Sequence, residues 1–139
     1  MKFNTKTRYG VRTMIEIALN DASVGVFQKD ISKNQEISVR YLDHIIASLK
    51  AAGLITTVKG KKSGYILTRD ASEISLYDIH NAFEAGINIV DCLAVSKQCE
   101  RELSCASKHY WDELNQIIVD YLKSKTLAEI VEKHYELKV

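Results

Sequence analysis

The sequence predicts a mainly α-helical fold with a small β-hairpin and a long helix near the C-terminus. Three observations predict it: amphipathic segments with helix caps in the first half, two β-prone segments around a glycine- and lysine-rich turn, and a wide apolar stripe near the end. A chain of 139 residues with 46% hydrophobic and 27% charged residues is long enough to bury a core, so we expect one compact domain.

The first half of the chain has the pattern of a helix-turn-helix. Apolar residues at helical spacing predict a first helix over about residues 5–21 and a second over 28–34, with Ile31 turned inward. A third helix is bounded by Ser38 as N-cap and by Gly53 as a left-handed C-cap. The short turn between the second and third helices completes the motif.

The third helix is expected to have two different faces. Its buried stripe is expected to consist of Tyr41, Leu42, Ile45, Ile46, Leu49 and Ala52. Its outward side is expected to consist of Val39, Arg40, Asp43, His44, Ala47 and Lys50. An outward-facing N-terminal turn on such a helix is what a DNA recognition helix requires.

Two short segments follow the third helix, residues 54–58 and 65–68, and both are rich in β-branched or aromatic residues. The turn between them, 59–64, contains two glycines and predicts a hairpin. Two strands directly after a recognition helix form a wing. The sequence therefore predicts a winged helix-turn-helix.

The rest of the chain divides into a fourth helix, an irregular segment and two C-terminal helices. Ser75 and Asp78 predict a capped helix that continues to about Ala85. From 87 to 107 no period is sustained, and this segment holds all three cysteines. The next helix carries an apolar stripe made of Tyr110, Trp111, Leu114, Ile117, Ile118, Tyr121 and Leu122. A capping box beginning at Thr126 then predicts a short last helix.

The charge is divided unevenly along the chain. Residues 1–70 contain 12 Lys+Arg and 6 Asp+Glu, whereas residues 71–139 contain 7 and 12. Because a basic surface attracts the phosphates of a duplex, we assign DNA binding to the first half. Lys59, Lys61 and Lys62 lie in the wing turn, where they can reach phosphates or the minor groove. The alternative for this lysine run is a solvated surface turn.

The third helix supplies the candidates for reading bases. Arg40 and Asp43 fall on its first exposed turns, and the hydroxyl of Ser38 can be shared with a phosphate. Tyr41 and Arg8 complete the set of DNA-binding candidates. The alternative is that Ser38 is only a cap and that Arg40 and Asp43 are surface neighbours.

Cys92, Cys99 and Cys105 form a C-x6-C-x5-C pattern inside the irregular segment. Thiolates are soft ligands that suit iron-sulfur clusters or zinc, and an iron-sulfur cluster is the favoured interpretation. Structural zinc sites usually pair their cysteines at closer spacing, so zinc is an alternative, as are thiols without a metal. Structural disulfides are rare in the reducing cytosol, which makes them the least favoured alternative.

Three cysteines leave a cluster one ligand short of four. His109 is the nearest histidine, four residues after Cys105, and it is our candidate for the fourth ligand. Glu100 and Glu102 are alternatives within the segment. The alternative for His109 itself is a surface histidine at the start of a helix.

Several classes of protein are disfavoured. No apolar run approaches the roughly 18 residues of a membrane span, and the first residues do not resemble a signal peptide, so we expect a cytoplasmic protein. No glycine-rich phosphate loop, no paired carboxylates and no nucleophile beside a base can be identified. We therefore expect no enzyme.

Along almost its whole length, the chain resembles a known family. The matching stretches are Thr5-Lys6-Thr7-Arg8-Tyr9-Gly10, Ile31-Ser32, Ile37-Ser38, Tyr41-Leu42, Gly53-Leu54, Val58-Lys59-Gly60, Gly64-Tyr65-Ile66-Leu67 and the three cysteines. In these features the chain resembles the bacterial winged-helix transcription regulators of the IscR, NsrR and CymR family, and the cysteines place it nearest the cluster-binding IscR and NsrR type.

The resemblance implies a homodimer with a long C-terminal dimerisation helix near 111–125 and a palindromic DNA operator. It also implies that the three cysteines bind a 2Fe-2S or 4Fe-4S cluster whose state sets DNA affinity. Members of the family without these cysteines, such as CymR, carry no cluster. The chain departs from the family at the wing, which lacks the frequent Arg-Gly-Pro, and at the fourth ligand. Lys108 occupies the IscR-like histidine position, and Arg8 occupies that of an NsrR-like aspartate from the partner subunit.

These observations lead to one hypothesis and one alternative. We divide the chain into a DNA-binding region 1–86, a cluster-binding segment 87–107 and dimerisation and C-terminal helices 108–139. In the hypothesis, gain, oxidation, nitrosylation or loss of the cluster reorders the segment 87–107 and changes the spacing of the two recognition helices. In the alternative, a metal-free regulator senses thiol redox state or a partner protein.

Overall fold

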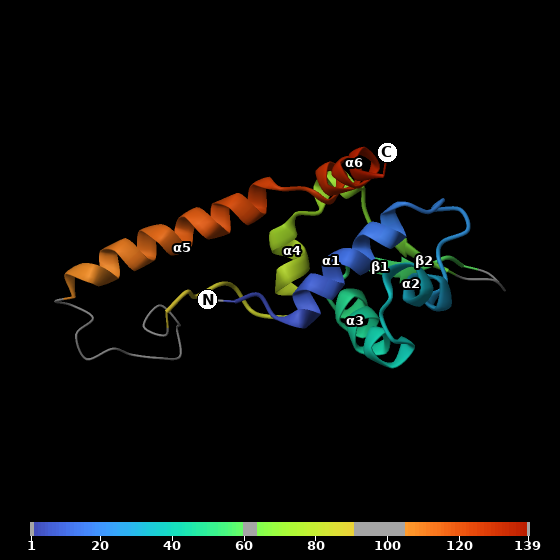
Figure 1. The fold of residues 1–139 in the computed structure, drawn as a ribbon, viewed down its shortest axis with the longest axis horizontal. Coiled ribbons are helices and arrows are strands. Elements are labelled where there is room, and N and C mark those ends of the chain that lie inside the picture. The colour runs from blue at the N-terminus through green and yellow to red at the C-terminus, as the bar shows by residue number, and fades with distance from the viewer. Residues whose placement is uncertain (1, 60–63, 91–104, 139) are drawn as a thin grey trace.

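The computed structural model describes residues 2–59, 64–90 and 105–138. Within these ranges the chain is mainly helical with one two-stranded antiparallel hairpin (Figure 1), as the sequence predicts. Its elements are α1 (Thr5–Ala18), α2 (Gln28–Gln35), α3 (Val39–Ala51), β1 (Ile55–Thr57), β2 (Tyr65–Leu67), the 3-10 turn η1 (Ala71–Glu73), α4 (Leu76–Asn81), α5 (Ala106–Ser124) and α6 (Leu127–Leu137).

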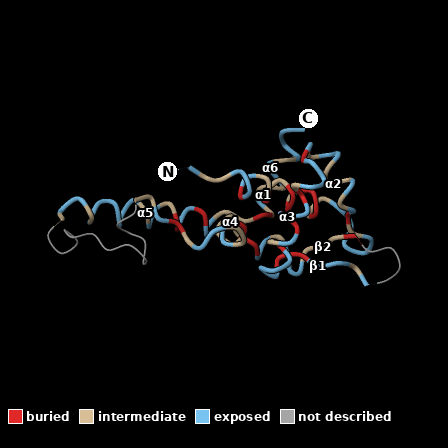
Figure 2. The backbone as a smooth tube through the Cα atoms, turned by 90° about the horizontal axis from the view of Figure 1, so that it is seen from below, coloured by how far each residue is buried: buried red, intermediate tan, exposed pale blue. Residues whose placement is uncertain are grey.

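The core lies where α1, α2 and α3 pack together, with the hairpin and α6 closing it. Fully buried side chains come from each of these helices, and Figure 2 shows the buried backbone gathered in this part of the molecule. They include Met14, Ile31, Leu42, Ile45, Leu49 and, from α6, Leu127. Burying a large aliphatic side chain contributes about 1.5–3 kcal/mol. This cluster therefore fixes the orientation of α3.

The ends of α3 agree with the sequence. The Ser38 hydroxyl accepts a hydrogen bond from the Tyr41 amide at 3.1 Å. Gly53 has φ +74°, and the Leu54 amide donates to the Leu49 carbonyl at 3.1 Å, which is the Schellman arrangement. The outward set is exposed as expected. Ala52, which was expected in the buried stripe, is exposed because it lies at the C-cap, beyond the last turn that faces the core.

Two predicted helix ends were wrong by several residues. Helix α1 ends at Ala18 rather than near 21, because the Asn20 side chain donates to the Glu16 carbonyl at 2.6 Å and the chain turns there. Helix α4 begins at the predicted Ser75 capping box but ends at Asn81 rather than near Ala85. The Asn81 side chain accepts from the Gly86 amide at 3.1 Å and closes the turn.

The hairpin is joined to the helical body through its base. Strand β1 pairs with β2 in the register Ile55↔Leu67, and Val26 forms a bridge with Tyr65 on the other edge of β2. At this point the backbones of Gly25 and Gly64 nearly touch, so that a Cβ on Gly64 would lie 2.6 Å from the Gly25 carbonyl carbon. Glycine is required here because there is no space for a side chain.

Helix α5 extends away from this body as an arm, whereas α6 folds back onto it (Figure 1). The C-terminal half of α5 is held by a second, smaller cluster made of Ile87, Val119 and Leu122. The turn between α5 and α6 is held by a bridge between Ser75 and Thr126, where the Leu76 amide donates to the Lys125 carbonyl at 2.9 Å. The predicted N-cap of the last helix, Thr126, is confirmed.

Candidate nucleic-acid interface and cysteine-bearing arm

The exposed face of α3 presents the candidate DNA-reading residues together. Arg40 and Asp43 are exposed on its first two turns, and Ser38 is exposed at the N-cap. Tyr41 is half-buried, and its ring packs edge-on against Tyr9 at 5.5 Å between centroids. Ser38, Arg40 and Asp43 are thus all exposed at the N-terminal end of α3, while Tyr41 faces the packing between α3 and α1.

Gln28, the first residue of α2, joins this surface although the sequence analysis did not select it. Its side-chain Nε2 donates to Asp43 Oδ1 at 2.5 Å and to the Val39 carbonyl at 3.2 Å. Residues 15 positions apart are linked in this way across the helix-turn-helix. No local pattern in the sequence indicates such a contact.

Buried polar contacts hold α2 against α1. The Glu16 carboxylate, on a nearly buried residue, accepts from Asn34 and from Gln35, each at 3.1 Å. Arg12 donates to both the side chain and the backbone carbonyl of Gln35. Glu36 then adopts the left-handed conformation, with φ 54° and ψ 47°, and turns the chain into α3. These contacts make α1 and the helix-turn-helix one unit.

The wing begins directly beside α3. Lys59 is exposed at the end of β1, and the Lys50 ammonium on α3 lies 6.0 Å from the centroid of the Tyr65 ring on β2. The contact between Lys50 and Tyr65 places the base of the wing next to α3. Lys61 and Lys62 lie outside the described residues.

Arg8 is the fourth residue of α1. It lines an apolar pocket of about 210 Å³, and its guanidinium donates to the Thr5 hydroxyl at 3.2 Å. The other lining residues come from the N-terminus, α1, α4 and α5, and are Phe3, Thr7, Val11, Leu76, His80 and Leu122. The structure does not bring Arg8 together with the α3 surface through these contacts.

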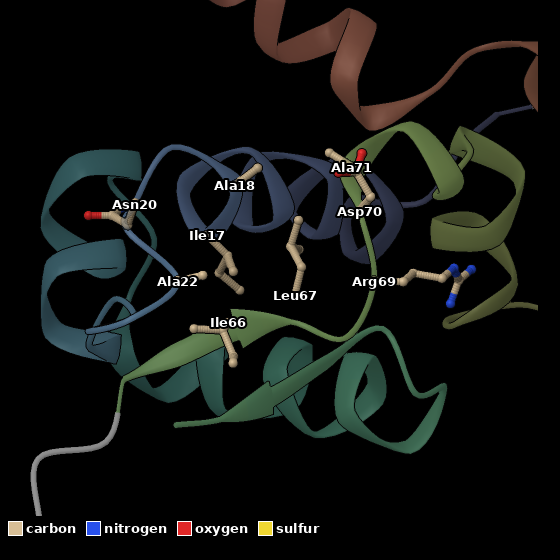
Figure 3. A pocket seen from close by; sticks show the side chains of 9 residues that line it. All are labelled: Ile17, Ala18, Asn20, Ala22, Ile66, Leu67, Arg69, Asp70 and Ala71. Carbon is tan, nitrogen blue, oxygen red and sulfur yellow. The ribbon is translucent and has the colours of Figure 1, made fainter. Parts of the chain in front are cut away.

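A larger cleft, of about 400 Å³, lies between α1 and β2 (Figure 3). Its polar lining is engaged elsewhere: Arg69 pairs with Asp78 at 3.3 Å, and Asp70 accepts from the Ser72 amide at 2.8 Å. The hydrogen bond from the Ser72 backbone, and then that from its hydroxyl, lower the pKa of Asp70 below 3.8. Asp70 therefore acts as the cap of the 3-10 turn η1.

Of the cysteines, Cys105 is described, and Cys92 and Cys99 lie outside the described residues. Cys105 is half-buried at the N-cap of α5, with its Sγ 3.1 Å from the Ser107 hydroxyl oxygen. A thiolate at this end of a helix is favoured by the helix dipole. His109 lies one turn further along, is 76% exposed, and has its Nε2 3.5 Å from the Glu113 carboxylate.

Soft thiolate and imidazole donors one helical turn apart fit the ligand chemistry of an iron-sulfur cluster. Within the described ranges, no three histidine, cysteine or acidic side chains are gathered so that they could hold a metal ion. Two of the three predicted cysteine ligands are outside those ranges, so the proposed ligand set stays a prediction.

The chain that leads into the cysteine segment is fixed to α5 by one side chain. Asn115 Nδ2 donates to the Ile87 carbonyl at 2.8 Å, and its Oδ1 accepts from the Ile89 amide at 2.9 Å. Asn115 thus satisfies two backbone groups of the segment in the manner of a neighbouring strand. We call this the Asn115 clamp.

A buried histidine fixes the same stretch to α1. His80 is 3% exposed, and its Nε2 lies 2.8 Å from the Gly86 carbonyl, to which it donates. Its Nδ1 lies 3.4 Å from the Thr7 hydroxyl of α1. The burial of His80 and these two contacts identify it as a structural residue.

Most of the predicted apolar stripe of α5 is exposed in the single chain. Tyr110 is 66% exposed and Ile117 59%, whereas Val119 and Leu122 pack on the body. The exposed members of the stripe are Tyr110, Trp111, Leu114, Ile117 and Tyr121. An exposed apolar surface of this kind is typical of an interaction site.

Residues 3–133 match the family model Rrf2, described as an iron-dependent transcriptional regulator. The chain belongs to the Rrf2 family.

Several Rrf2-type relatives match over most of their length. Protein rrf2 of Nitratidesulfovibrio vulgaris is 34% identical, with 94% of this chain and 87% of the relative covered. The HTH-type transcriptional regulator IscR of Klebsiella pneumoniae is 31% identical over 100% of this chain and 85% of its own. The family and these names support DNA binding and transcription regulation, and they exclude an enzyme.

Solved structures of two relatives share the fold. IscR of T. potens has a TM-score of 0.79 at 30% identity, covering 100% of this chain and 92% of that one. CymR of B. subtilis, a global cysteine regulator, also has a TM-score of 0.79, at 28% identity, covering 96% and 98%. The winged-helix architecture is therefore confirmed. In the part of this Rrf2-family chain that the structure describes, no helix is long and apolar enough to span a membrane.

Proposed function

We propose that this Rrf2-family protein binds a palindromic operator as a homodimer, with α3 in the major groove and the wing on the backbone. The exposed face of α3, opposite the buried side chains of Leu42, Ile45, Ile46 and Leu49, carries this proposal. In it, Arg40 and Asp43 face the bases, Ser38 and the wing lysines Lys59, Lys61 and Lys62 meet phosphates, and Tyr41 supports α3 from its inner side. Arg8 contributes through the surrounding positive charge.

A salt series separates phosphate contacts from base contacts. Replacing Lys59 with alanine is expected to weaken binding to all duplexes and to lower the slope of log K against log salt by about 0.9 for one lost phosphate contact. Replacing Arg40 is expected to change which bases are preferred. Lys133→Ala, in the exposed part of α6, is the matched control and should leave the slope unchanged. Identical behaviour of Lys59→Ala and Arg40→Ala would refute the division of roles.

The homodimer is supported by the exposed stripe of α5. Tyr110, Leu114, Ile117 and Tyr121 follow the spacing i, i+4, i+7, i+11, which places them along one side of the helix. A second α5 that presents the same stripe can cover it with symmetric contacts. Two recognition helices held in this way would read half-sites about 34–36 Å apart.

The proposed cofactor is an iron-sulfur cluster, 2Fe-2S or 4Fe-4S, held by Cys92, Cys99 and Cys105 with His109 as the fourth ligand. The family description as iron-dependent and the likeness to IscR support it. When bound, the cluster supplies iron that responds to redox change or nitric oxide. Cys92, Cys99 and Cys105 would hold that iron within the segment 87–107.

The described residues offer a route from this segment to α3. The Asn115 clamp holds Ile87 and Ile89 on α5, and His80 holds Gly86 near Thr7 on α1. Glu16 and Arg12 of α1 are hydrogen-bonded to α2. A displacement of residues 86–89 would therefore be transmitted both to the arm and to the helix-turn-helix. We infer that operator affinity is regulated along this route.

Anaerobic purification tests the cofactor. We expect a coloured protein with visible absorption and with iron and acid-labile sulfide bound, and Cys105→Ser should lose both. Ser107→Ala, whose hydroxyl lies beside Cys105, is the matched control and should keep them. A colourless protein with stoichiometric zinc, or with no metal after reconstitution, would overturn the cluster assignment.

The second candidate function is a metal-free regulator that senses thiol redox state or a partner protein. Its support is the likeness to CymR, whose structure has the same TM-score to this chain, 0.79, as the structure of IscR. Titration of the three thiols against metal content separates the two candidates, since accessible thiols with no metal favour the second. Both candidates include the cytoplasmic location and the division into 1–86, 87–107 and 108–139.

A further inference from the structure

We infer that Gln28 and Asp43 act as one specificity unit that reads the exocyclic amino group of a cytosine in the operator. This inference rests on the proposed docking of α3 in the major groove. The observation behind it is the 2.5 Å hydrogen bond from Gln28 Nε2 to Asp43 Oδ1 on the exposed side of the helix-turn-helix.

The orientation of the Gln28 amide is forced by its neighbours. Both groups facing Nε2, the Val39 carbonyl and the Asp43 carboxylate, are acceptors. An amide nitrogen has two hydrogens to donate, and one goes to each. If the amide were flipped, its oxygen would face two other oxygens, so the observed orientation is the stable one.

With its donors used, the pair presents acceptors alone to a ligand. Within the described ranges, Gln28 Oε1 and Asp43 Oδ2 have no hydrogen-bond partner. Gln28 is half-buried and anchored, whereas Asp43 is exposed, so Gln28 holds the carboxylate in one orientation. A carboxylate near phosphates is repelled unless a base donor compensates it.

The chemistry of the major groove then selects the base. Guanine and thymine present acceptors there, apart from the thymine methyl group, whereas cytosine N4 and adenine N6 present donors. Two-point reading of adenine by glutamine needs a donor for N7, and Gln28 has already used its own. Cytosine N4, which needs an acceptor alone, is therefore the base group that fits the pair.

The role assigned to Gln28 is to position Asp43. Replacing Gln28 with leucine keeps the approximate volume and removes both hydrogen bonds, so the carboxylate becomes free to rotate. We expect preference for cytosine at one operator position to fall by about tenfold in Gln28→Leu and in Asp43→Ala, with little change at other positions. Lys29→Ala, the exposed neighbour on α2, is the control and should lower affinity without moving base preference.

The test is selection of bound duplexes from a random pool by the full-length wild type and the three variants. It is followed by binding to the best site with the selected cytosine replaced by a pyrimidinone that lacks the 4-amino group. We expect this replacement to lower the affinity of the wild type by about the same factor as Gln28→Leu lowers affinity for the natural site. The affinity of the Gln28→Leu variant should fall little further on the pyrimidinone site.

The outcomes are separable. An equal preference for cytosine in wild type and Gln28→Leu, or undiminished binding to the pyrimidinone site, would overturn the inference while leaving α3 as the reading helix. Loss of binding to every sequence in Gln28→Leu, accompanied by a lower melting temperature, would also overturn it by showing a packing role. Absence of any selective binding by the wild type would instead overturn the proposed function.

Discussion

Helices α3 and α5 both carry an apolar stripe, but within the described residues most of the first stripe is buried and most of the second is exposed. In α3, Leu42, Ile45, Ile46 and Leu49 are buried against α1, α2 and the hairpin, and the exposed side is mostly polar. In α5, Val119 and Leu122 are buried, while five large apolar side chains along the arm stay exposed.

The difference indicates how the two helices obtain their positions. The orientation of α3 is set by packing within one chain, so its exposed face is formed without a partner. The arm α5 is fixed by the Asn115 clamp near its middle and by the small cluster around Ile87 along its C-terminal half, and its exposed stripe needs a second surface. In the proposed function, DNA reading thus depends on a helix that one chain positions by itself. Regulation depends on a helix whose exposed stripe needs a second surface.

The largest expected effect is on α3. Leu42→Ala removes a side chain that is 0% exposed and should lower the free energy of unfolding by about 2–5 kcal/mol, because a cavity remains. Val39→Ala, exposed on the same helix, should change it by about 0.5 kcal/mol or less. Urea denaturation at low protein concentration measures both. Similar losses for the two variants would contradict the burial of one side of α3.

The next effect tests the arm. Trp111→Ala should weaken association of two chains by about 2 kcal/mol or more, because large aromatic side chains dominate interface energies. Sedimentation over a range of concentrations measures the monomer-dimer constant. Glu113→Ala, on the other side of the same turn, is the control. An unchanged constant for Trp111→Ala would place the interface elsewhere.

A smaller effect is expected where the arm meets the body. Asn115→Ala removes both hydrogen bonds of the clamp and should cost about 1–3 kcal/mol of local stability, since two backbone groups lose their partner. Hydrogen exchange should become faster at the Ile89 amide. Gln116→Ala loses a surface bond to Asp120 and should leave that amide unchanged. Unchanged exchange in Asn115→Ala would mean that the clamp does not hold the segment.

The smallest expected effect is on the pH dependence of folding stability. Hydrogen bonds from the Ser72 backbone and hydroxyl lower the pKa of Asp70 below 3.8, and those from Ser23 do the same for Asp21. A depressed folded pKa stabilises the fold above pH 3.8, and this contribution disappears as the pH falls through the folded value. Asp70→Asn keeps a cap without titrating. The stability difference between it and the wild type should therefore shrink on acidification, as acid unfolding curves would show.

Local signals in the sequence identified most of the fold. Ser38, Gly53, Ser75 and Thr126 are caps whose effect depends on neighbours within a few residues, and each was located correctly. The end of α4 was missed because its turn depends on the Asn81 side chain reaching Gly86. The 3-10 turn capped by Asp70 was not expected either.

The candidate site was less predictable because it depends on contacts between elements. Gln28 and Asp43 lie on separate helices, and Asn115 meets a backbone 26 and 28 residues earlier in the chain. Such pairings depend on the packed positions of whole helices. An apolar stripe such as that of α5 indicates burial, but it does not say whether the covering surface belongs to the same chain.

The anchoring of α5 near its middle gives the arm the properties of a cantilever. Cys105 stands at one tip, and Asn115 marks the support. The overhang between them is about 15 Å at 1.5 Å per residue. A tilt of about 10° at the support displaces that tip by roughly 3 Å, so a few ångströms of movement at the thiolate correspond to a small rotation beside α1.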